Sequence, residues 1–291
     1  MMTTKRILVI VMMLSLAFTF AQDKEEVKDG WKKGGNASFT INQTAFNNEW
    51  TGGGIANLAG NLLLNYDFNL KQGDFIWDNK IIADYGVNKN DGDQNFAKTN
   101  DRLEFNSLAG KKAKGFWYYS GYFNMKTQMD RNADGLSHFF SPAYFQAGPG
   151  MLWKKSDNLN VNISPAAAKM TMVHAHYTTV ATALETAFNN AGGYYGVDAN
   201  KTSRFEIGAS VRGYYKLNIA KNISMENVLG LYSNYLEEAK NVDVDYTMNL
   251  VMTVNKFITT NLVFQAIYDD NVQRNGFQVR EAFGAGLNFN F

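Results

Sequence analysis

The sequence has no cysteine and only 3 prolines among its 291 residues. Without a thiol the chain can form no disulfide, and it offers no cysteine for thiolate chemistry or lipid attachment. Beyond the first 21 residues it also lacks an apolar run long enough for a membrane-spanning helix. The 28 basic residues are balanced by 27 acidic ones, which argues against a nucleic-acid partner, because such a protein needs a clustered basic face.

The amino-terminal segment, residues 1–21, has the features of a secretory signal peptide. Lys5 and Arg6 precede an apolar segment that is too short to serve comfortably as a membrane span. Thr-Phe-Ala at residues 19–21 is an acceptable cleavage sequence, so the mature chain is expected to begin at the next residue. Residues 22–33 are charged and predict a short periplasmic tail.

Aromatic residues make up 14% of the chain and recur at alternate positions. Alternation with period two is typical of strands that have one apolar and one polar face. Twelve segments show it, at residues 35–46, 54–69, 74–88, 99–110, 115–129, 139–153, 158–172, 203–218, 222–236, 242–255, 260–269 and 276–291. Many are longer than a globular strand of about 5–6 residues and suit tilted strands that cross a bilayer. The pattern breaks at residues 164–166, so the predicted count is about 12 within a range of roughly 10–14.

The last fifteen residues show the alternation most clearly. One face is apolar: Phe277, Val279, Phe283, Ala285, Leu287, Phe289 and Phe291. The other face is polar or small, as in the closing strand of a bacterial outer-membrane barrel. The aromatic end at Phe291 is then the assembly signal, and the barrel-assembly machinery is an expected partner. Aromatic residues near other strand ends fit the girdles at the two membrane interfaces: Trp50, Trp77, Trp117, Trp153, Tyr85, Tyr235 and Tyr268.

The connections between the predicted strands alternate between short and long. Short turns lie near residues 71–73, 111–114, 155–157, 220–222 and 257–259. Longer loops lie near residues 47–53, 88–98, 129–138, 173–202, 237–241 and 269–276. Outer-membrane barrels have short periplasmic turns and longer outer loops, which places both termini in the periplasm. In the longest loop, residues 178–188 carry apolar side chains at helical spacing and predict either a short amphipathic helix or a loop with a transient helical turn.

The chain is therefore predicted to be all-β. Residues 34–291 are expected to form a single antiparallel transmembrane β-barrel in the bacterial outer membrane, in contact with outer-membrane lipid. A soluble secreted β-sandwich is the alternative.

Charged residues on the polar faces are candidates to line the barrel lumen. Seven are basic and seven acidic: Lys80, Arg102, Lys126, Arg204, Arg212, Lys216, Arg280, Asp78, Asp84, Glu104, Glu206, Glu226, Asp243 and Asp245. A pore that selects by charge should show a ring of one sign, whereas balanced charges in a narrow lumen are expected to pair with each other. About twelve strands lie between the filled eight-stranded and the open sixteen-stranded cases, so a plugged scaffold and a narrow conduit both stay open.

The three histidines lie in or beside predicted outer loops. His174 and His176 are two residues apart and could share a strand face as metal ligands, although exposed imidazoles in a polar loop are the simpler interpretation. A lipid hydrolase would need a serine nucleophile and a histidine base, for which Ser137 with His138, or Ser164 with His174, are the candidate pairs. The sequence favours no enzymatic activity and predicts no cofactor.

Five short motifs resemble a known family. They are Trp50-Thr51-Gly52-Gly53-Gly54, Lys98-Thr99-Asn100-Asp101, Thr127-Gln128, Phe139-Phe140-Ser141-Pro142 and Ser164-Pro165. On these motifs the chain resembles, over most of its mature length, an uncharacterised barrel family of Bacteroidota, domain of unknown function 3078. The resemblance implies an outer-membrane barrel and supplies no activity, so no functional residue can be carried over.

Three functions are compatible with these observations. The favoured one is a channel or transporter for small solutes or lipid-like molecules, with paired charges and Asn residues lining the lumen and residues 173–202 acting as a lid. The second is a non-conducting structural or accessory barrel that docks a partner complex. The third is an outer-membrane lipid hydrolase, which would need Ser, His and an acid to converge at the outer leaflet.

Removal of residues 1–21 is expected to leave a chain that needs detergent to remain in solution, because its apolar strand faces require lipid. Sedimentation of the purified chain with and without detergent measures this requirement. Full solubility without detergent would instead favour the soluble β-sandwich.

Overall fold

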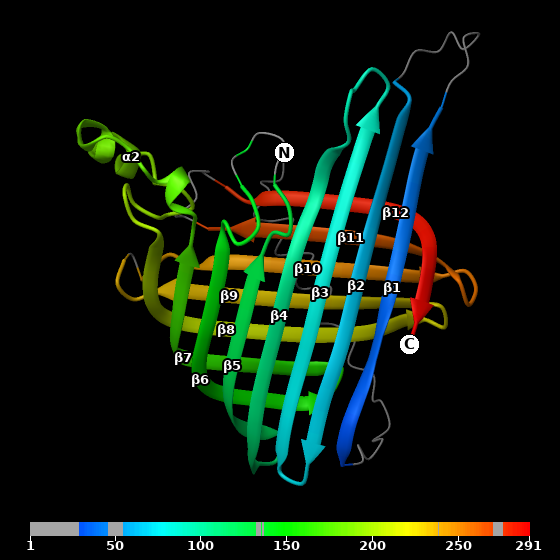
Figure 1. Ribbon diagram of the computed structural model, residues 1–291. Helices are drawn as coiled ribbons and strands as arrows, with labels where there is room; N and C mark the ends of the chain where they lie inside the picture. Colours follow the sequence, from blue (N-terminus) through cyan, green and yellow to red (C-terminus); the bar gives the residue numbers. More distant parts are fainter. Residues whose placement is uncertain (1–28, 46–54, 132–134, 136, 238, 270–275) are drawn as a thin grey trace, which may run out of the picture.

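The computed structural model describes residues 29–45, 55–131, 135, 137–237, 239–269 and 276–291 (Figure 1). The expected signal peptide, the first part of the expected tail and the Trp50–Gly54 motif lie outside the described residues. Twelve strands form one closed antiparallel barrel in which each strand pairs with its neighbours in sequence and β1 pairs with β12. The predicted fold class is therefore confirmed.

The strands are β1 (Gly30–Thr44), β2 (Asn57–Gln72), β3 (Phe75–Asn90), β4 (Ala97–Lys114), β5 (Trp117–Thr127), β6 (Ala143–Ser156), β7 (Leu159–Met172), β8 (Ser203–Ala220), β9 (Ile223–Asn234), β10 (Asp243–Thr253), β11 (Ile258–Tyr268) and β12 (Gln278–Asn290). Between β7 and β8 lie η1 (Ala175–Tyr177), η2 (Thr182–Leu184) and α2 (Glu185–Asn190). None of the helices in the described ranges is long and apolar enough to cross a bilayer.

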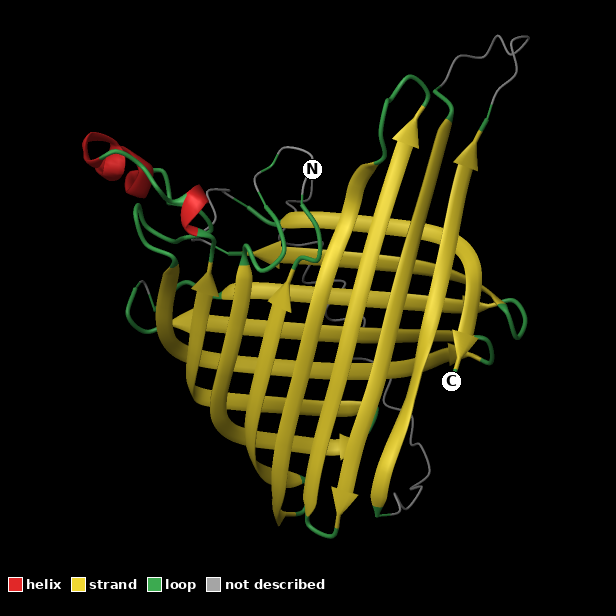
Figure 2. Cartoon of the chain, viewed as in Figure 1, coloured by secondary structure: helices red, strands yellow, loops and turns green. Residues whose placement is uncertain are grey.

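The barrel has a turn end and a loop end. At the turn end the strands are joined by the short turns 73–74, 115–116, 157–158, 221–222 and 254–257, and β1 starts and β12 finishes there. At the loop end the connections are longer, with residues 173–202 the longest. This confirms the alternation of short and long connections. In Figure 2 strands β1–β7 cross in front of β8–β12, as expected for strands that are strongly tilted around a barrel.

Three strand boundaries differ clearly from the sequence-based ones. Strand β4 continues to Lys114, because residues predicted as a turn near 111–114 pair with β5 instead. Strand β1 begins at Gly30, inside the expected tail, because residues 30–33 pair with the end of β2. Trp31 anchors this extension, with its ring 5.9 Å from that of Trp77. Strand β6 begins at Ala143 rather than residue 139, because His138 and Ser141 form a turn with mutual backbone hydrogen bonds instead.

The predicted break at residues 164–166 is a β-bulge. The register between β7 and β8 shifts there, and so does that between β6 and β7, where Pro149 faces the bulge. Proline has no N–H to donate to a ladder, so two prolines on neighbouring strands interrupt the pairing. Side chains replace the lost bonds: the Ser164 hydroxyl donates to the Pro149 carbonyl at 2.5 Å, and the Tyr235 hydroxyl donates to the Pro165 carbonyl at 3.0 Å. The extra residue also changes which alternate positions of β7 face inward.

The outer surface of the barrel is apolar. Large side chains such as Leu62 and Phe283 are 53% and 62% exposed, and they alternate with inward polar residues. A run of aromatic rings crosses several strands, with centroids 6.0–6.4 Å apart. Its members are Tyr66, Phe68, Phe105, Phe123 and Phe145. This arrangement suits a sheet that is surrounded by hydrocarbon.

Closure depends on close contact between β1 and β12. Six residue pairs join these strands, and Gly35 and Phe291 exchange backbone hydrogen bonds of 2.8 and 3.0 Å at the turn end. The Phe291 ring stacks on Tyr66 at 6.1 Å and covers Gly35, where a Cβ atom would lie 3.0 Å from the ring. At Gly286 a Cβ atom would collide with the Phe39 carbonyl oxygen. Glycine is therefore required at this seam.

Gly286→Val is expected to lower the folded fraction several-fold, because its side chain blocks approach of β12 to β1. Heat-modifiable mobility on semi-native gels measures the folded fraction. Gly213→Val is the matched control, since nothing lies within 4 Å of a Cβ atom there. Equal folding of the two variants would contradict the role of close approach at the seam.

Candidate functional site in the barrel interior

The fourteen charges predicted to line the lumen all fall on one face of the paired strands. Strand β8 shows the arrangement, because Glu206, Arg212 and Lys216 lie at successive heights from the loop end to the turn end. Ion pairs between strands that are not neighbours identify this face as the inner one. The charges form three groups, which we call the loop-end, middle and turn-end clusters.

The middle cluster spans the barrel. Lys126 Nζ on β5 lies 3.0 Å from Asp245 Oδ2 on β10, five places away around the ring of twelve strands. Twelve strands about 4.8 Å apart and tilted by about 40° would enclose a circle of roughly 24 Å diameter. One lysine and one aspartate cannot bridge that distance together. The barrel is therefore narrowed between β5 and β10.

A second contact of the middle cluster joins β8 to β4. Arg212 Nη2 lies 2.9 Å from Asn106 Oδ1 and 3.7 Å from Glu104 Oε1. Glu104 is also 3.7 Å from Arg102 and accepts a hydrogen bond from Asn124 at 3.1 Å. These contacts place both signs of charge at one level across the interior.

The loop-end cluster centres on Lys169 of β7. Its ammonium lies 2.9 Å from Asp243, 3.4 Å from Glu206 and 3.7 Å from Asp269. Arg204 joins the group through a 2.8 Å contact between its Nε and Glu206. Lys169 was not among the predicted lumen charges, because the bulge on β7 disrupts the alternation from which its direction could be inferred.

The turn-end cluster includes another lysine that the sequence analysis missed. Lys154 Nζ on β6 lies 2.6 Å from Asp78 on β3 and 3.1 Å from Asp157. On neighbouring strands, Lys216 and Glu226 form a 2.8 Å pair. Lys154 was missed because it adjoins Lys155 at the end of a strand, where alternation no longer separates the two faces.

The remaining predicted charges make more local contacts. Lys80 lies 3.9 Å from Asp67 on the neighbouring strand, and Asp84 accepts a hydrogen bond from Asn61 at 2.8 Å. Arg280 pairs in register with a glutamine of β11 near the loop end.

A small group of buried aromatic and aliphatic side chains lies beside the loop-end cluster. Tyr122 and Tyr232 are 7% and 5% exposed and pack with Ala167, while Leu108 lies against the same group. Lys169 lies 5.0 Å above the Tyr232 ring, so this group adjoins the loop-end cluster. Side chains of four strands thus meet inside the barrel.

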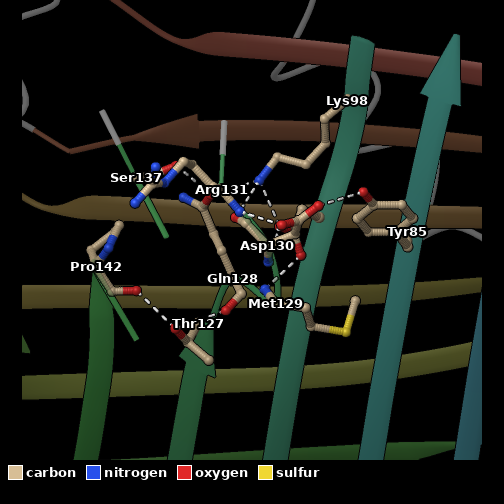
Figure 3. Close-up of polar contacts among 10 residues, drawn as sticks. Tyr85, Lys98, Thr127, Gln128, Met129, Asp130, Arg131, Ser137 and Pro142 are labelled. Atoms are coloured by element: carbon tan, nitrogen blue, oxygen red, sulfur yellow. Dashed lines mark hydrogen bonds and ion pairs between the residues drawn. The ribbon is translucent and has the colours of Figure 1, made fainter. Parts of the chain in front are cut away.

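The rim at the loop end is held by a compact polar network (Figure 3). Lys98 donates to the Asp101 carboxylate at 2.6 Å and to the Asp130 carbonyl at 2.8 Å. The same aspartate, Asp101, accepts the backbone N–H groups of Met129 and Asp130. From the next strand, the Tyr85 hydroxyl donates to Asp130 Oδ2 at 2.9 Å. Lys98 also donates to Gln128 Oε1 at 3.2 Å, so two of the motifs, residues 98–101 and 127–128, meet at this rim.

The long loop 173–202 packs at its base and extends beyond the barrel. Val197 at the base is fully buried, and the Tyr195 ring lies 6.4 Å from that of Tyr144 on β6. Helix α2 lies beyond the loop ends of β6 and β7 in Figure 1. The predicted helix is shorter than the sequence suggested, and none of its residues is buried. A short helical segment, η2 with α2, is therefore present in the loop, as one of the two sequence-based alternatives expected.

The histidines and serines do not form the arrangements that were considered from sequence. His138 and His174 have ring centroids 5.1 Å apart, whereas His174 contacts His176 through the latter's backbone N–H. No group of three or more potential metal-ligating side chains occurs among the residues described. The Ser137 hydroxyl donates to Gln128 and that of Ser164 to a backbone carbonyl, so both proposed nucleophiles point away from a histidine.

A family model described as a protein of unknown function, DUF3078, matches residues 41–132. The motifs at residues 98–101 and 127–128 lie within this match, whereas those at residues 139–142 and 164–165 lie beyond it. The chain is therefore similar to an uncharacterised family over its first strands rather than over most of its length. No curated protein matches the sequence.

Solved outer-membrane barrels are similar to the chain over most of its length. The translocator domain of the autotransporter NalP from Neisseria meningitidis has 8% identity and a TM-score of 0.36, with 92% of this chain and 90% of that chain covered. An outer membrane channel from Pseudomonas putida F1 has 8% identity and a TM-score of 0.40, covering 94% and 99%. The outer membrane channel DcaP of Acinetobacter baumannii has 13% identity and a TM-score of 0.31, covering 94% and 100%. At these values the likeness carries no information on activity.

The hydrogen bonds at the rim are expected to affect the pKa of the Asp130 carboxyl. Because the Tyr85 hydroxyl donates to its carboxylate, the pKa of Asp130 is held below the usual value, with a smaller effect from the Arg131 N–H. The Tyr85–Asp130 bond is then fully present above the ordinary aspartate pKa and is lost as the pH falls through the lowered one. In Tyr85→Phe the midpoint is expected to rise toward about 3.9.

Carboxyl ¹³C NMR of Asp130 in the detergent-solubilised protein measures this midpoint. Tyr235→Phe removes a hydroxyl that bonds elsewhere, to the Pro165 carbonyl, and serves as the control. An unchanged Asp130 midpoint in Tyr85→Phe would show that the hydroxyl does not set the carboxyl's acidity.

Proposed function

We propose that this chain is an integral outer-membrane barrel whose interior is closed by its own side chains, and that it acts as a structural or accessory barrel presenting its loops to a partner complex. Export by a cleaved signal peptide at residues 1–21, insertion by the barrel-assembly machinery through Phe291 and an origin in Bacteroidota are parts of this proposal. The closed sheet and the apolar outward faces support the membrane location.

The single observation that carries the proposal is the contact between Lys126 and Asp245. These residues come from nearly opposite strands and meet at 3.0 Å, so the interior is narrow where they lie. The Arg212–Glu104 contact and the Tyr122–Tyr232 group add further side chains across the same interior. A conduit needs a continuous wet path, and these contacts favour a filled lumen instead.

A gated channel or transporter for small solutes or lipid-like molecules is the second candidate. It is favoured by the exposure of the crossing pair, because the Asp245 side chain is 45% exposed and water therefore reaches it. Charges of both signs line the same space, so such a channel would discriminate weakly by charge.

Planar-bilayer conductance separates the two candidates. The refolded wild type and a variant lacking residues 173–202 are both expected to be silent, because the interior contacts do not depend on that loop. The double variant Lys126→Ala, Asp245→Ala is expected to show resolvable openings, because it removes a contact that crosses the lumen.

The matched control is Lys80→Ala, Asp67→Ala, which removes a pair between neighbouring strands at 3.9 Å and should stay silent. Steady wild-type conductance, or conductance that appears when residues 173–202 are deleted, would contradict the filled lumen and establish the gated conduit.

A further inference from the structure

An apolar groove lies on the outside of the barrel near the loop end of β1–β3. Its lining includes Phe39, Ile41, Leu58, Leu62, Val87 and Phe96. Leu58, Leu62 and Phe96 are each about half exposed, so the groove is open to its surroundings. It belongs to the outward face, whereas the candidate site described above lies inside the barrel.

The height of the groove follows from the geometry of β3. From Trp77, near the turn end, to Val87 the strand climbs about 25 Å, at about 3.3 Å per residue and a tilt of roughly 40°. This climb equals the height of the apolar band of an outer-membrane barrel, about 25 Å. With Trp77 at the lower interface, the groove therefore extends from the outer half of the apolar band to its upper boundary.

A cation lies at the upper edge of the groove. Lys89 pairs in register with Leu58, and its ammonium lies 5.8 Å from the Phe96 ring centroid. The same ammonium is 3.3 Å from the Gln94 carbonyl oxygen. The nearby carboxylate of Asp93 accepts the Asn90 N–H at 2.9 Å. Lys89 thus places a positive charge just above the apolar band, at head-group height.

The structure also limits what can occupy the groove. From Phe39 to Ile41 the backbone of β1 pairs with both β2 and β12, and β2 pairs with β3, so an extended peptide cannot add as a strand across this part of the groove. An alkyl chain needs no backbone partner and matches an apolar lining. A phosphate beside the head of that chain would match Lys89.

We propose that this groove binds an outer-leaflet glycolipid of the lipid A class, with one acyl chain against Leu62 and Phe39 and a phosphate against Lys89. This inference rests on the proposed outer-membrane location and adds a specific lipid to it. The groove holds the chain by apolar contact, and the lysine distinguishes phosphorylated from unphosphorylated head groups.

Native mass spectrometry of the mature protein in phosphatidylcholine nanodiscs doped with diphosphorylated lipid A tests the proposal. The wild type is expected to retain lipid A, and Lys89→Gln to retain about fivefold less, the effect of one lysine near an anionic surface. Dephosphorylated lipid A should be retained by the wild type as weakly as lipid A is by Lys89→Gln. Leu62→Trp fills the groove and should lower retention of both lipids.

The matched control is Lys256→Gln, because Lys256 also lies over an aromatic ring, at 4.7 Å from Phe257, but at the turn end. Equal lipid A retention by the Lys89 and Lys256 variants would overturn the proposal. So would equal retention of phosphatidylglycerol and lipid A by the wild type, which would indicate a general anionic-lipid surface.

Failure of the groove and failure of the membrane location give different results. If the protein needs detergent but its retention of lipid A does not depend on Lys89, only the proposed lipid site is wrong. If the protein stays soluble without detergent and retains no lipid, the proposed outer-membrane location is wrong as well.

Discussion

The closure of backbone hydrogen bonding into a ring is the constraint on which the rest of this structure depends. Every strand has two partners, and the ring is completed where Gly35 and Phe291 exchange hydrogen bonds. A closed ring leaves no sheet edge, so its outer surface can face hydrocarbon. The polar residues of each alternating strand must then share one enclosed space, and the interior chemistry follows from that requirement.

Inside that space the charges neutralise one another across short distances. Pairs such as Lys126–Asp245 join strands five places apart around the ring, so they act as ties between distant strands. Together with the Tyr122–Tyr232 group they make the barrel cross-section narrower than a circular ring of the same strand number. The polar interior of this protein thus contributes to the shape of the barrel as well as to its charge balance.

Period-two alternation predicted about twelve strands and the inward direction of regular charges, because it maps directly onto the faces of a sheet. The alternating lengths of the connections predicted the two ends of the barrel. Alternation could not predict which charges meet, since the Lys126–Asp245 contact depends on how far the ring is narrowed. It also missed Lys154 and Lys169, which lie where alternation is interrupted. The polar rim around Asp101 brings together loop residues whose spacing carries no periodic signal.

The bulge at Ser164–Ala167 also decides which residues of β7 face the barrel interior. In a regular strand, losing one residue would turn the rest of the strand inside out and present Lys169 to lipid. The bulge leaves one residue outside the ladder, so the inward-facing residues of β7 change from even to odd numbers. Asn162 faces inward before the bulge and Lys169 faces inward after it. With the bulge, β7 carries one residue more than the strand beside it, and the inward-facing side chains on both sides of the bulge still point into the barrel.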